Sequence, residues 1–155
     1  MKMQMKTEQA VKRVLSSAQK RPELRDCRRL PYGRLVRQGD VYIGRVDTFT
    51  EFAALMTKFI RARNSAALMT APAKWVPTDN RQLAPGHTKG SRHIVGIGEC
   101  KIYAPDGGGF LVGPRIEADG TWELNHPEHA AYLFGRGCHF VSYQLDARTL
   151  RRVQD

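Results

Sequence analysis

Proline and glycine divide the chain after Ser65 into short stretches, and this division constrains the fold more than any other feature. Pro72, Pro77 and Pro85 interrupt any long helix, and residues 107–109 are three consecutive glycines. The stretches between them are rich in β-branched and aromatic residues, which is typical of strands. We expect strands over these ranges: 66–70, 92–103, 109–116, 121–124, 130–134 and 138–145.

Two hairpin turns are predicted within this part of the chain. Asp119 and Gly120 separate residues 115–118 from 121–124, and Asp-Gly is a pair favoured in two-residue hairpins. Residues 135–137 read Gly-Arg-Gly and predict the second turn. Several short strands at this spacing indicate a compact antiparallel barrel or sandwich.

Between Val36 and Asn64 the sequence predicts one strand and one helix. Residues 36–46 alternate in polarity and predict a strand interrupted by Gly39 and Gly44. Thr48 and Glu51 have the spacing of a capping box, which predicts the start of a helix. Its apolar face, predicted to lie in the core, comprises Phe49, Phe52, Met56, Phe59 and Ile60. We therefore expect an α+β fold, mainly β, with this helix packed on one face or closing one end.

Positive charge is concentrated near the N-terminus. Of the 25 Lys and Arg residues, 12 precede Val46, with only four carboxylates, so residues 1–45 carry +8 of the net charge of +10. From Val46 onward there are 13 basic and 11 acidic residues. Apolar residues recur at helical spacing within residues 7–20 and predict an amphipathic helix. We expect a basic arm over residues 1–34 and a β-rich domain over 35–155.

Such an arm is suited to an anionic partner, because arginine and lysine neutralise phosphates and release counterions. We expect nucleic acid or another polyanion, with neighbouring subunits of a larger assembly as further partners. An acidic protein partner and a solvated basic face that only maintains solubility remain open as alternatives. The candidate anion-binding residues are Lys6, Lys12, Arg13, Lys20, Arg21, Arg25, Arg28, Arg29 and Arg34, together with Lys89 and Arg92 of a glycine-containing loop.

The sequence also argues against several classes of protein. The three cysteines are scattered, without a Cys-x-x-Cys pair, so they predict neither a disulfide framework nor a cysteine zinc site. No export signal and no apolar run of membrane-spanning length is found. The loop at 86–93 lacks the spacing of a phosphate-binding P-loop, and neither Ser91 nor Cys138 has a nucleophile motif. We predict no catalytic residues, no membrane partner and a cytoplasmic location.

Four of the five histidines fall into two clusters. His87 and His93 flank the glycine-containing loop, and His126 and His129 are three residues apart. If the two segments meet, His93, His126 and His129, with Glu128 or Glu99, have the donors for a zinc, iron or manganese ion and an open water position. The alternative is that these histidines bind loop carbonyls, with no cofactor. His139 stands alone in a strand and is interpreted as structural.

The order of these motifs resembles a family of small β-rich proteins of bacteria and phages that has no assigned function. The resemblance spans residues 35–145 and omits the basic arm. The family pattern places a carboxylate after Gly86 and a histidine two residues before His93, where this chain has His87 and Ser91. It implies a β-rich fold and a phage or mobile-element setting, including a virion. The motifs that carry it are Arg37–Val41, Leu83–Gly86, Gly90–His93, His126–His129 and Gly137–Gln144.

Three functions remain open at this point. The first is a non-enzymatic assembly or nucleoprotein component, such as a phage structural or accessory protein, whose basic arm binds an anionic surface. The second is a metal-dependent enzyme of cupin-like shape that uses the three histidines. The third is a small regulator or inhibitor that binds a host protein. Charge distribution favours the first, because it is the strongest signal in the sequence.

Overall fold

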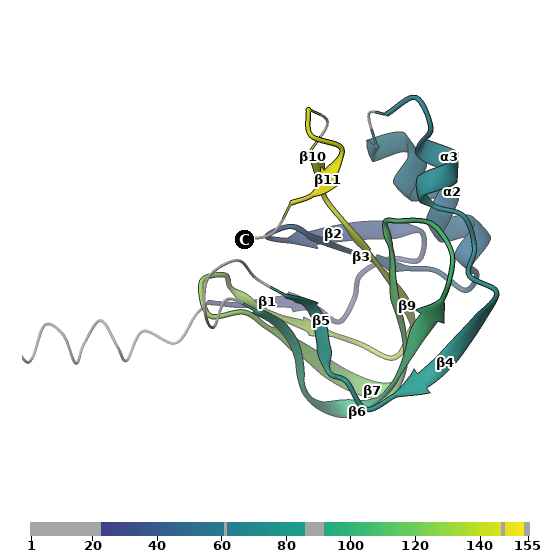
Figure 1. Cartoon of the computed structure of the whole chain (residues 1–155). Helices are drawn as coiled ribbons and strands as arrows, with labels where there is room; N and C mark the ends of the chain where they lie inside the picture. Colours follow the sequence, from purple (N-terminus) through teal and green to yellow (C-terminus); the bar gives the residue numbers. More distant parts are fainter. Residues whose placement is uncertain (1–22, 61, 86–91, 147, 154–155) are drawn as a thin grey trace, which may run out of the picture.

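A computed structural model describes residues 23–60, 62–85, 92–146 and 148–153 of the chain. Most of these residues belong to one sheet that curls into half of a barrel, with helices at one end (Figure 1). This confirms the expectation of an α+β fold that is mainly β. The helix predicted over residues 7–20 lies outside the described residues. None of the helices described is long and apolar enough to cross a membrane.

The main sheet has nine strands in the order β1-β8-β7-β9-β3-β2, with β6 on the other edge of β7 and β4 and β5 pairing to β6. Its strand pairs are antiparallel except β1 with β8, which is parallel. The strands are β1 Leu24–Cys27, β2 Arg34–Gln38, β3 Val41–Arg45, β4 Lys74–Thr78, β5 Gln82–Pro85, β6 Arg92–Asp106, β7 Val112–Asn125, β8 Ala131–Phe134 and β9 Gly137–Tyr143. A small separate sheet pairs β10 Leu145–Asp146 with β11 Arg151–Arg152.

Strand β7 organises the sheet. One edge pairs with β6, and the other pairs first with β9 through residues 112–118 and then with β8 through residues 122–124. The two hairpins predicted from the sequence are therefore wrong. Asp119 and Gly120 lie inside β7, and residues 135–136 connect β8 to β9 along the same edge. Pairing with β6 on both sides of Asp119 outweighs the local preference of Asp-Gly for a turn.

Two further predictions of secondary structure are corrected. Residues 36–46 form a hairpin of β2 and β3, not one strand, because Gly39 has a φ of 55° and reverses the chain. Residues 66–70 do not form a strand. Instead, Ser65–Leu68 is a short helix, α3. Its sequence, Ser-Ala-Ala-Leu, contains good helix formers and no β-branched residue.

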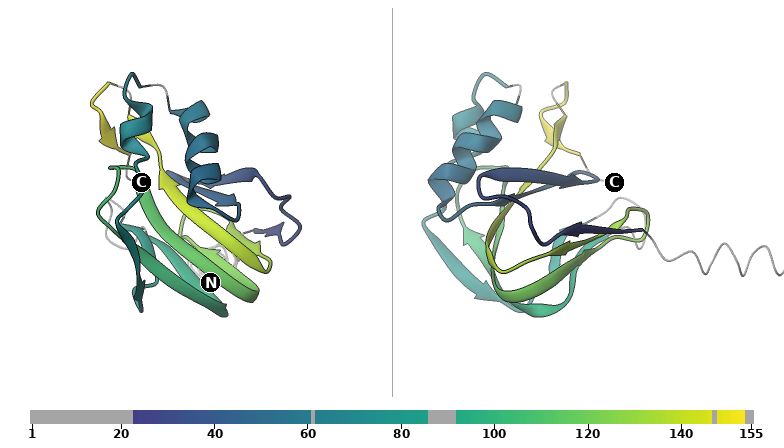
Figure 2. Two further views of the ribbon diagram at one scale, coloured as in Figure 1. Left: turned by 90° about the vertical axis from the view of Figure 1, so that its right-hand side faces the viewer. Right: turned by 180° about the vertical axis from the view of Figure 1, so that it is seen from behind.

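Helix α2 (Phe49–Phe59) covers the outside of the sheet beside β3 and β9 (Figure 2). Phe52 and Met56 are buried, as predicted, and the Phe52 ring stacks on Phe140 at 5.7 Å between ring centroids. Gly44 permits this approach, since a Cβ there would lie 2.7 Å from the Phe52 ring. Phe59 was predicted to lie in the core but is 58% exposed, because it stands at the last turn of the helix.

The capping box at the start of α2 has the predicted geometry. Thr48 Oγ1 accepts a hydrogen bond from the Glu51 N–H at 3.3 Å, and Glu51 Oε2 accepts one from the Thr48 N–H at 3.0 Å. Thr48→Ala is expected to lower the free energy of unfolding by about 1 kcal/mol, measured by urea denaturation. Thr50→Ala, at an exposed position in the first turn, is the control and is expected to change stability little.

The sheet includes part of the predicted basic arm. β1 pairs with β8 from Leu24↔Ala131 to Cys27↔Phe134, so the segment from Leu24 onward belongs to the fold and not to an appendage. Gln38, at the end of β2, donates to the carbonyl of Ala130 just before β8. β1 thus extends the sheet from β8, whereas the β2–β3 hairpin extends it from β9. The candidate site lies where these two parts of the sheet separate.

Candidate functional site

A cluster of four buried polar side chains lies within the core. Gln38 is 1% exposed, Asp40 2%, His93 1% and His126 3%. They come from three separate segments: the β2–β3 turn, the start of β6 and the turn between β7 and β8. Burial of polar groups is unfavourable unless each is hydrogen bonded, so such a cluster requires a structural or functional reason.

The structure brings together the three histidines that the sequence suggested as metal ligands. The ring centroids of His93 and His126 are 4.5 Å apart, those of His126 and His129 are 4.4 Å apart, and those of His93 and His129 are 6.3 Å apart. The two carboxylates suggested with them do not lie in the buried cluster, since Glu99 and Glu128 are both exposed. His87 lies outside the described residues.

Hydrogen bonds fix the orientation of His93. Gln38 Nε2 donates to the carbonyls of Leu124 at 3.3 Å and Ala130 at 2.6 Å, so its Oε1 must be the atom that faces His93 Nδ1 at 3.0 Å. That oxygen accepts a hydrogen bond, which places a proton on Nδ1. The other ring nitrogen, Nε2, lies 2.8 Å from Asp40 Oδ1, and this close contact requires a proton between the imidazole and the carboxylate. His93 and Asp40 therefore form a buried pair that shares a proton.

His126 and His129 both lie in the turn between β7 and β8. His126 Nδ1 accepts a hydrogen bond from the Glu128 N–H at 3.1 Å, so the neutral ring carries its proton on Nε2. His129 is partly buried and lines a pocket of about 430 Å³. The pocket lies between β1 and the β2–β3 turn, and its lining also includes Arg25, Gln38 and Tyr132. It borders the histidine cluster at His129.

No ready-made metal centre is apparent in the part of the chain that the structure describes. Within it, no three histidine, cysteine, aspartate or glutamate side chains form a group that could hold an ion. Gln38 and Asp40, the residues that orient His93, were not predicted as site residues. Their sequence signal is weak, because Gln-Gly-Asp is an ordinary composition for a turn.

His139 has the structural role predicted for it. It is 1% exposed and contacts the rings of Trp122 and Phe134 edge-on, at 5.3 and 5.4 Å between centroids. Burial, with a contribution from the Arg45 charge, lowers the pKa of His139 to about 4. The ring is therefore neutral at pH 7 and forms part of the apolar core.

The predicted anion-binding residues divide into two groups. Lys6, Lys12, Arg13, Lys20, Arg21 and Lys89 lie outside the described residues. Arg25, Arg28, Arg29, Arg34 and Arg92 are described, and all five are exposed. Arg28 pairs with Asp26 at 2.8 Å and holds the pKa of Asp26 near 2, whereas Arg25 Nη1 donates to Tyr132 Oη at 2.8 Å. Among the described residues, no carboxylate beyond residue 34 forms an ion pair with these arginines.

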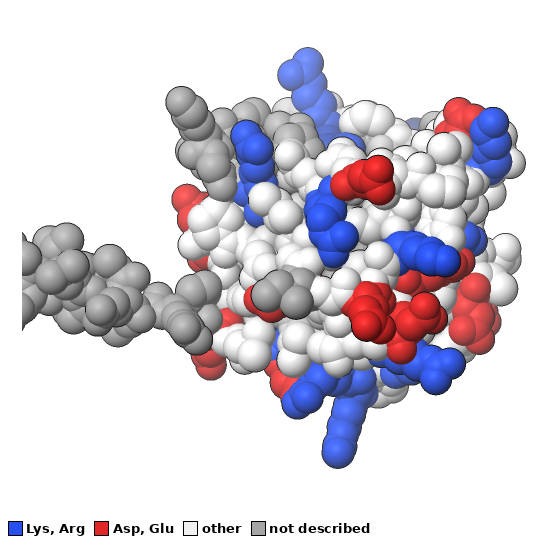
Figure 3. All heavy atoms as spheres, turned by 90° about the horizontal axis from the view of Figure 1, so that it is seen from below, with Lys and Arg blue, Asp and Glu red and all other residues white. Residues whose placement is uncertain are grey.

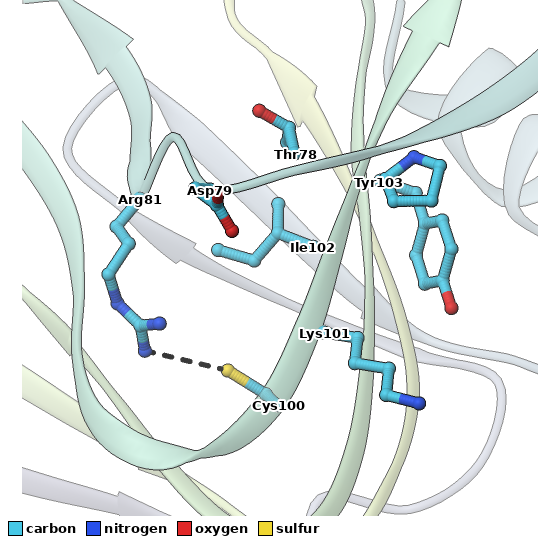
Figure 4. A pocket seen from close by; sticks show the side chains of 8 residues that line it. Thr78, Asp79, Arg81, Cys100, Lys101, Ile102 and Tyr103 are labelled. Atoms are coloured by element: carbon cyan, nitrogen blue, oxygen red, sulfur yellow. Dashed lines mark hydrogen bonds between the residues drawn. The ribbon is translucent and has the colours of Figure 1, made fainter.

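A second pocket, of about 640 Å³, lies against β6 between β4 and β5 (Figure 4). The Arg81 guanidinium donates to the carbonyls of Val95 at 2.9 Å and Gly96 at 2.8 Å, and its Nη2 lies 3.9 Å from Cys100 Sγ. Burial raises the pKa of the Cys100 thiol more than Arg81 lowers it. The thiol is therefore protonated at pH 7, which leaves this pocket without an activated nucleophile.

Compared with known proteins, the chain matches no family model, no curated protein and no solved structure. The resemblance to β-rich proteins of bacteria and phages therefore stays a prediction.

Proposed function

We propose that the protein is a non-enzymatic nucleoprotein component that binds the phosphate backbone of DNA or RNA through its arginine-rich N-terminal region. The observation that carries the proposal is the exposure of five arginines between β1 and the end of β2, of which Arg28 alone forms an ion pair among the described residues, with Asp26. These are Arg25, Arg28, Arg29, Arg34 and Arg37. Exposed guanidinium groups are suited to phosphate, because their planar donors match phosphate oxygens.

The five arginines lie on one continuous stretch of the chain, from β1 to β2. β1, the connection over residues 28–33 and β2 lie at one margin of the molecule (Figure 2). Tyr132 joins the two strands, since its hydroxyl accepts from Arg25 and donates to the Arg37 carbonyl at 2.7 Å. Residues 1–22, which precede this surface in the chain, add six Lys and Arg residues against the single carboxylate of Glu8. These residues 1–22, here called the leader, and the five arginines together supply the positive charge to neutralise several consecutive phosphates.

The chain from Val46 onward has 13 basic and 11 acidic residues, which supports a localised role for the arginines. The face over β6 and β7 shows Lys and Arg interspersed with Asp and Glu (Figure 3). Within β7, Arg115 pairs with Glu117 at 2.8 Å. In the proposed function the balanced body contacts neighbouring subunits of an assembly, in a virion or in a bacterial cytoplasm, while the arm follows the polyanion as an amphipathic helix.

A competing explanation is that the arginines only protect an exposed sheet edge. Among the described strands β2 pairs with β3 alone, and charged side chains on an edge strand prevent edge-to-edge aggregation. Protection of an edge does not involve residues 1–22 and predicts no salt-dependent affinity for nucleic acid. The two explanations are therefore separable by measurement.

The test is to neutralise the leader in the full-length chain. The six leader residues Lys2, Lys6, Lys12, Arg13, Lys20 and Arg21 are replaced by glutamine. Affinity for a labelled oligonucleotide, followed by fluorescence anisotropy at several salt concentrations, is expected to fall. The slope of log K against log salt is expected to shrink by about 0.9 for each phosphate of duplex DNA that the variant no longer neutralises.

The matched control removes the same number of charges from the body. It replaces Lys58, Arg63, Lys74, Lys101, Arg136 and Arg148, all exposed, and is expected to retain most of the affinity and slope. Equal losses in both variants would reduce the effect to net charge and contradict a localised site. Retention of full affinity by the leader variant would contradict the proposal. If the wild-type protein instead captures an acidic protein, and this capture persists after nuclease treatment, the regulator is favoured.

A further inference from the structure

We propose that the pocket between β4, β5 and β6 binds a free α-amino acid with an apolar side chain, through Arg81 for its carboxylate and Asp79 for its ammonium group. This inference goes beyond nucleic-acid binding, since it uses neither the leader nor the five arginines of β1 and β2. It rests on the shape of the pocket, the fixed position of Arg81 and the two opposite charges that line the same space.

The pocket is formed by a difference in length between β6 and the chain that faces it. Thr78 in β4 pairs with Ile102, and Gln82 in β5 pairs with Ile94. Residues 78 and 82, four steps apart in the chain, thus face residues of β6 that are eight steps apart. The additional residues of β6 contain two irregularities in its pairing with β7, and such bulges bend a strand. The bend leaves the space of about 640 Å³.

Hydrogen bonds hold the wall of the pocket in place. Thr78 Oγ1 accepts from the Asn80 N–H at 3.1 Å, and Asn80 Oδ1 accepts from the Gln82 N–H at 3.0 Å. Both contacts are of the kind that stabilises turns. The Arg81 carbonyl accepts from the Val95 N–H at 2.8 Å, which ties this turn to β6. The pocket therefore exists before a ligand arrives, and a preformed site lowers the entropic cost of binding.

The Arg81 guanidinium is fixed in an orientation that leaves donors for an anion. Its Nε and Nη2 donate to the carbonyls of Val95 and Gly96 at 2.9 and 2.8 Å. Its Nη1 forms no hydrogen bond with any of the described residues. Arg81 also has no ion pair among them. Guanidinium groups bind carboxylates through parallel N–H donors, so this immobilised side chain is suited to the carboxylate of a ligand.

Asp79 supplies the opposite charge on the same side of β6. Its carboxylate points toward Ile102, whereas the Arg81 guanidinium points toward Cys100 (Figure 4). Cys100 and Ile102 are alternate residues of one strand and share a face. Within the described part of the chain, Asp79 forms no ion pair, with Arg81 or any other residue. Two opposite charges that line one space without contact suit a ligand with a carboxylate and an ammonium group, which an α-amino acid carries on one carbon atom.

The surface between the two charges defines the side chain of the ligand. Ile102 is 4% exposed, and Cys100 is half-buried with a protonated thiol. Contact with this apolar surface favours an apolar side chain, because burial of apolar area is favourable. Lys101 and Tyr103 also line the pocket but lie on the opposite face of β6 (Figure 4), so neither is assigned to the ligand.

The test measures binding of leucine, valine and phenylalanine to the tag-free, full-length protein by isothermal titration calorimetry at neutral pH. We expect one site per chain for at least one of the three. Two analogues of leucine assign the charges: isocaproate lacks the ammonium group, and leucinamide lacks the carboxylate. Each is expected to bind at least about tenfold more weakly than leucine, because it loses a charge-assisted hydrogen bond.

Asp79→Asn is the variant that assigns the ammonium group. It keeps the shape of the side chain and removes its charge, so it is expected to weaken leucine binding at least about tenfold and to leave the affinity for isocaproate no lower than in the wild type. Lys101→Met removes a charge from the other face of β6 and is the matched control, expected to bind leucine as the wild type does. Asp79 is exposed and forms no hydrogen bond that an asparagine would break, so the variant is expected to stay folded, which circular dichroism checks.

Alkylation of Cys100 locates the ligand independently of any variant. Saturating leucine is expected to slow the reaction of Cys100 with iodoacetamide, measured by peptide mass spectrometry. Cys138, half-buried in β9 and outside the pocket, is the internal reference and is expected to react at an unchanged rate. Four outcomes would overturn the inference: no binding of any of the three amino acids, equal affinity for leucine and isocaproate, unchanged leucine affinity in Asp79→Asn, and no protection of Cys100.

Discussion

Replacing Asp40 by alanine is expected to lower the free energy of unfolding by about 3–5 kcal/mol. Asp40 and His93 are 2% and 1% exposed, and their contact of 2.8 Å is the only ion pair among the described residues that lies wholly in the interior. Removal of the carboxylate leaves the Nε2 side of the buried imidazole without its acceptor. The loss is measurable as a shift of the urea midpoint at pH 7.

A double-mutant cycle separates the interaction energy between Asp40 and His93 from the contribution of each side chain to the free energy of unfolding. His93→Leu combined with Asp40→Leu removes both polar groups, and replacement of a buried pair by apolar residues is often close to neutral. We therefore expect the double variant to be more stable than Asp40→Ala alone. If the single variant loses less than about 1 kcal/mol, the range of an exposed pair, the buried shared-proton arrangement is contradicted.

The free energy of unfolding is expected to fall by about 3 kcal/mol as the pH is lowered from about 6.5 to about 4, because the unfolded chain binds a proton at His139 more readily than the folded protein does. The folded state holds the pKa of His139 near 4, against 6.5 in the unfolded chain. The unfolded state therefore binds the proton first, so the stabilisation is complete above pH 6.5 and is lost as the pH falls towards 4. This loss is measurable by urea denaturation at several pH values.

His139→Leu is the variant that assigns this acid sensitivity. Leucine does not titrate and suits the apolar contacts with Trp122 and Phe134. Between pH 6.5 and 4, the variant is expected to lose about 3 kcal/mol less than the wild type. Identical pH profiles in the two proteins would show that other groups cause the acid sensitivity.

Local sequence signals predicted the fold where a feature is decided within a few residues. The capping box of Thr48 and Glu51, the long strand from Arg92 and the mainly β composition are of this kind. The prediction of a turn at Asp119-Gly120 was wrong because the course of β7 is decided by its pairing with the strands β6, β8 and β9. A local motif carries no information on that pairing. The prediction of a single strand over residues 36–46 was wrong because the alternation of polarity continues through the turn at Gly39 and hides the hairpin.

The histidine cluster was predictable in part. The spacing of His126 and His129 and the position of His93 suggested that the segments meet, and the rings do lie together. Gln38 and Asp40 were not predicted as partners, because nothing local distinguishes a buried polar pair from an ordinary turn. The orientation of His93 depends on Gln38, which is held by the carbonyls of Leu124 and Ala130, 86 and 92 residues away in the chain. Contacts across such separations leave no short motif.

The order of strands in the sheet has a consequence for synthesis on the ribosome. Within the described part of the chain, β1 pairs only with β8, and the β2–β3 hairpin joins the sheet only through β9. The strands synthesised first therefore lack a partner until the last strands are made. Until β8 and β9 emerge, the arginine-rich beginning of the chain has no sheet to join, and long-range pairing of this kind makes folding slow. A nascent chain stalled before Ala131 is therefore expected to be sensitive to protease throughout its N-terminal third.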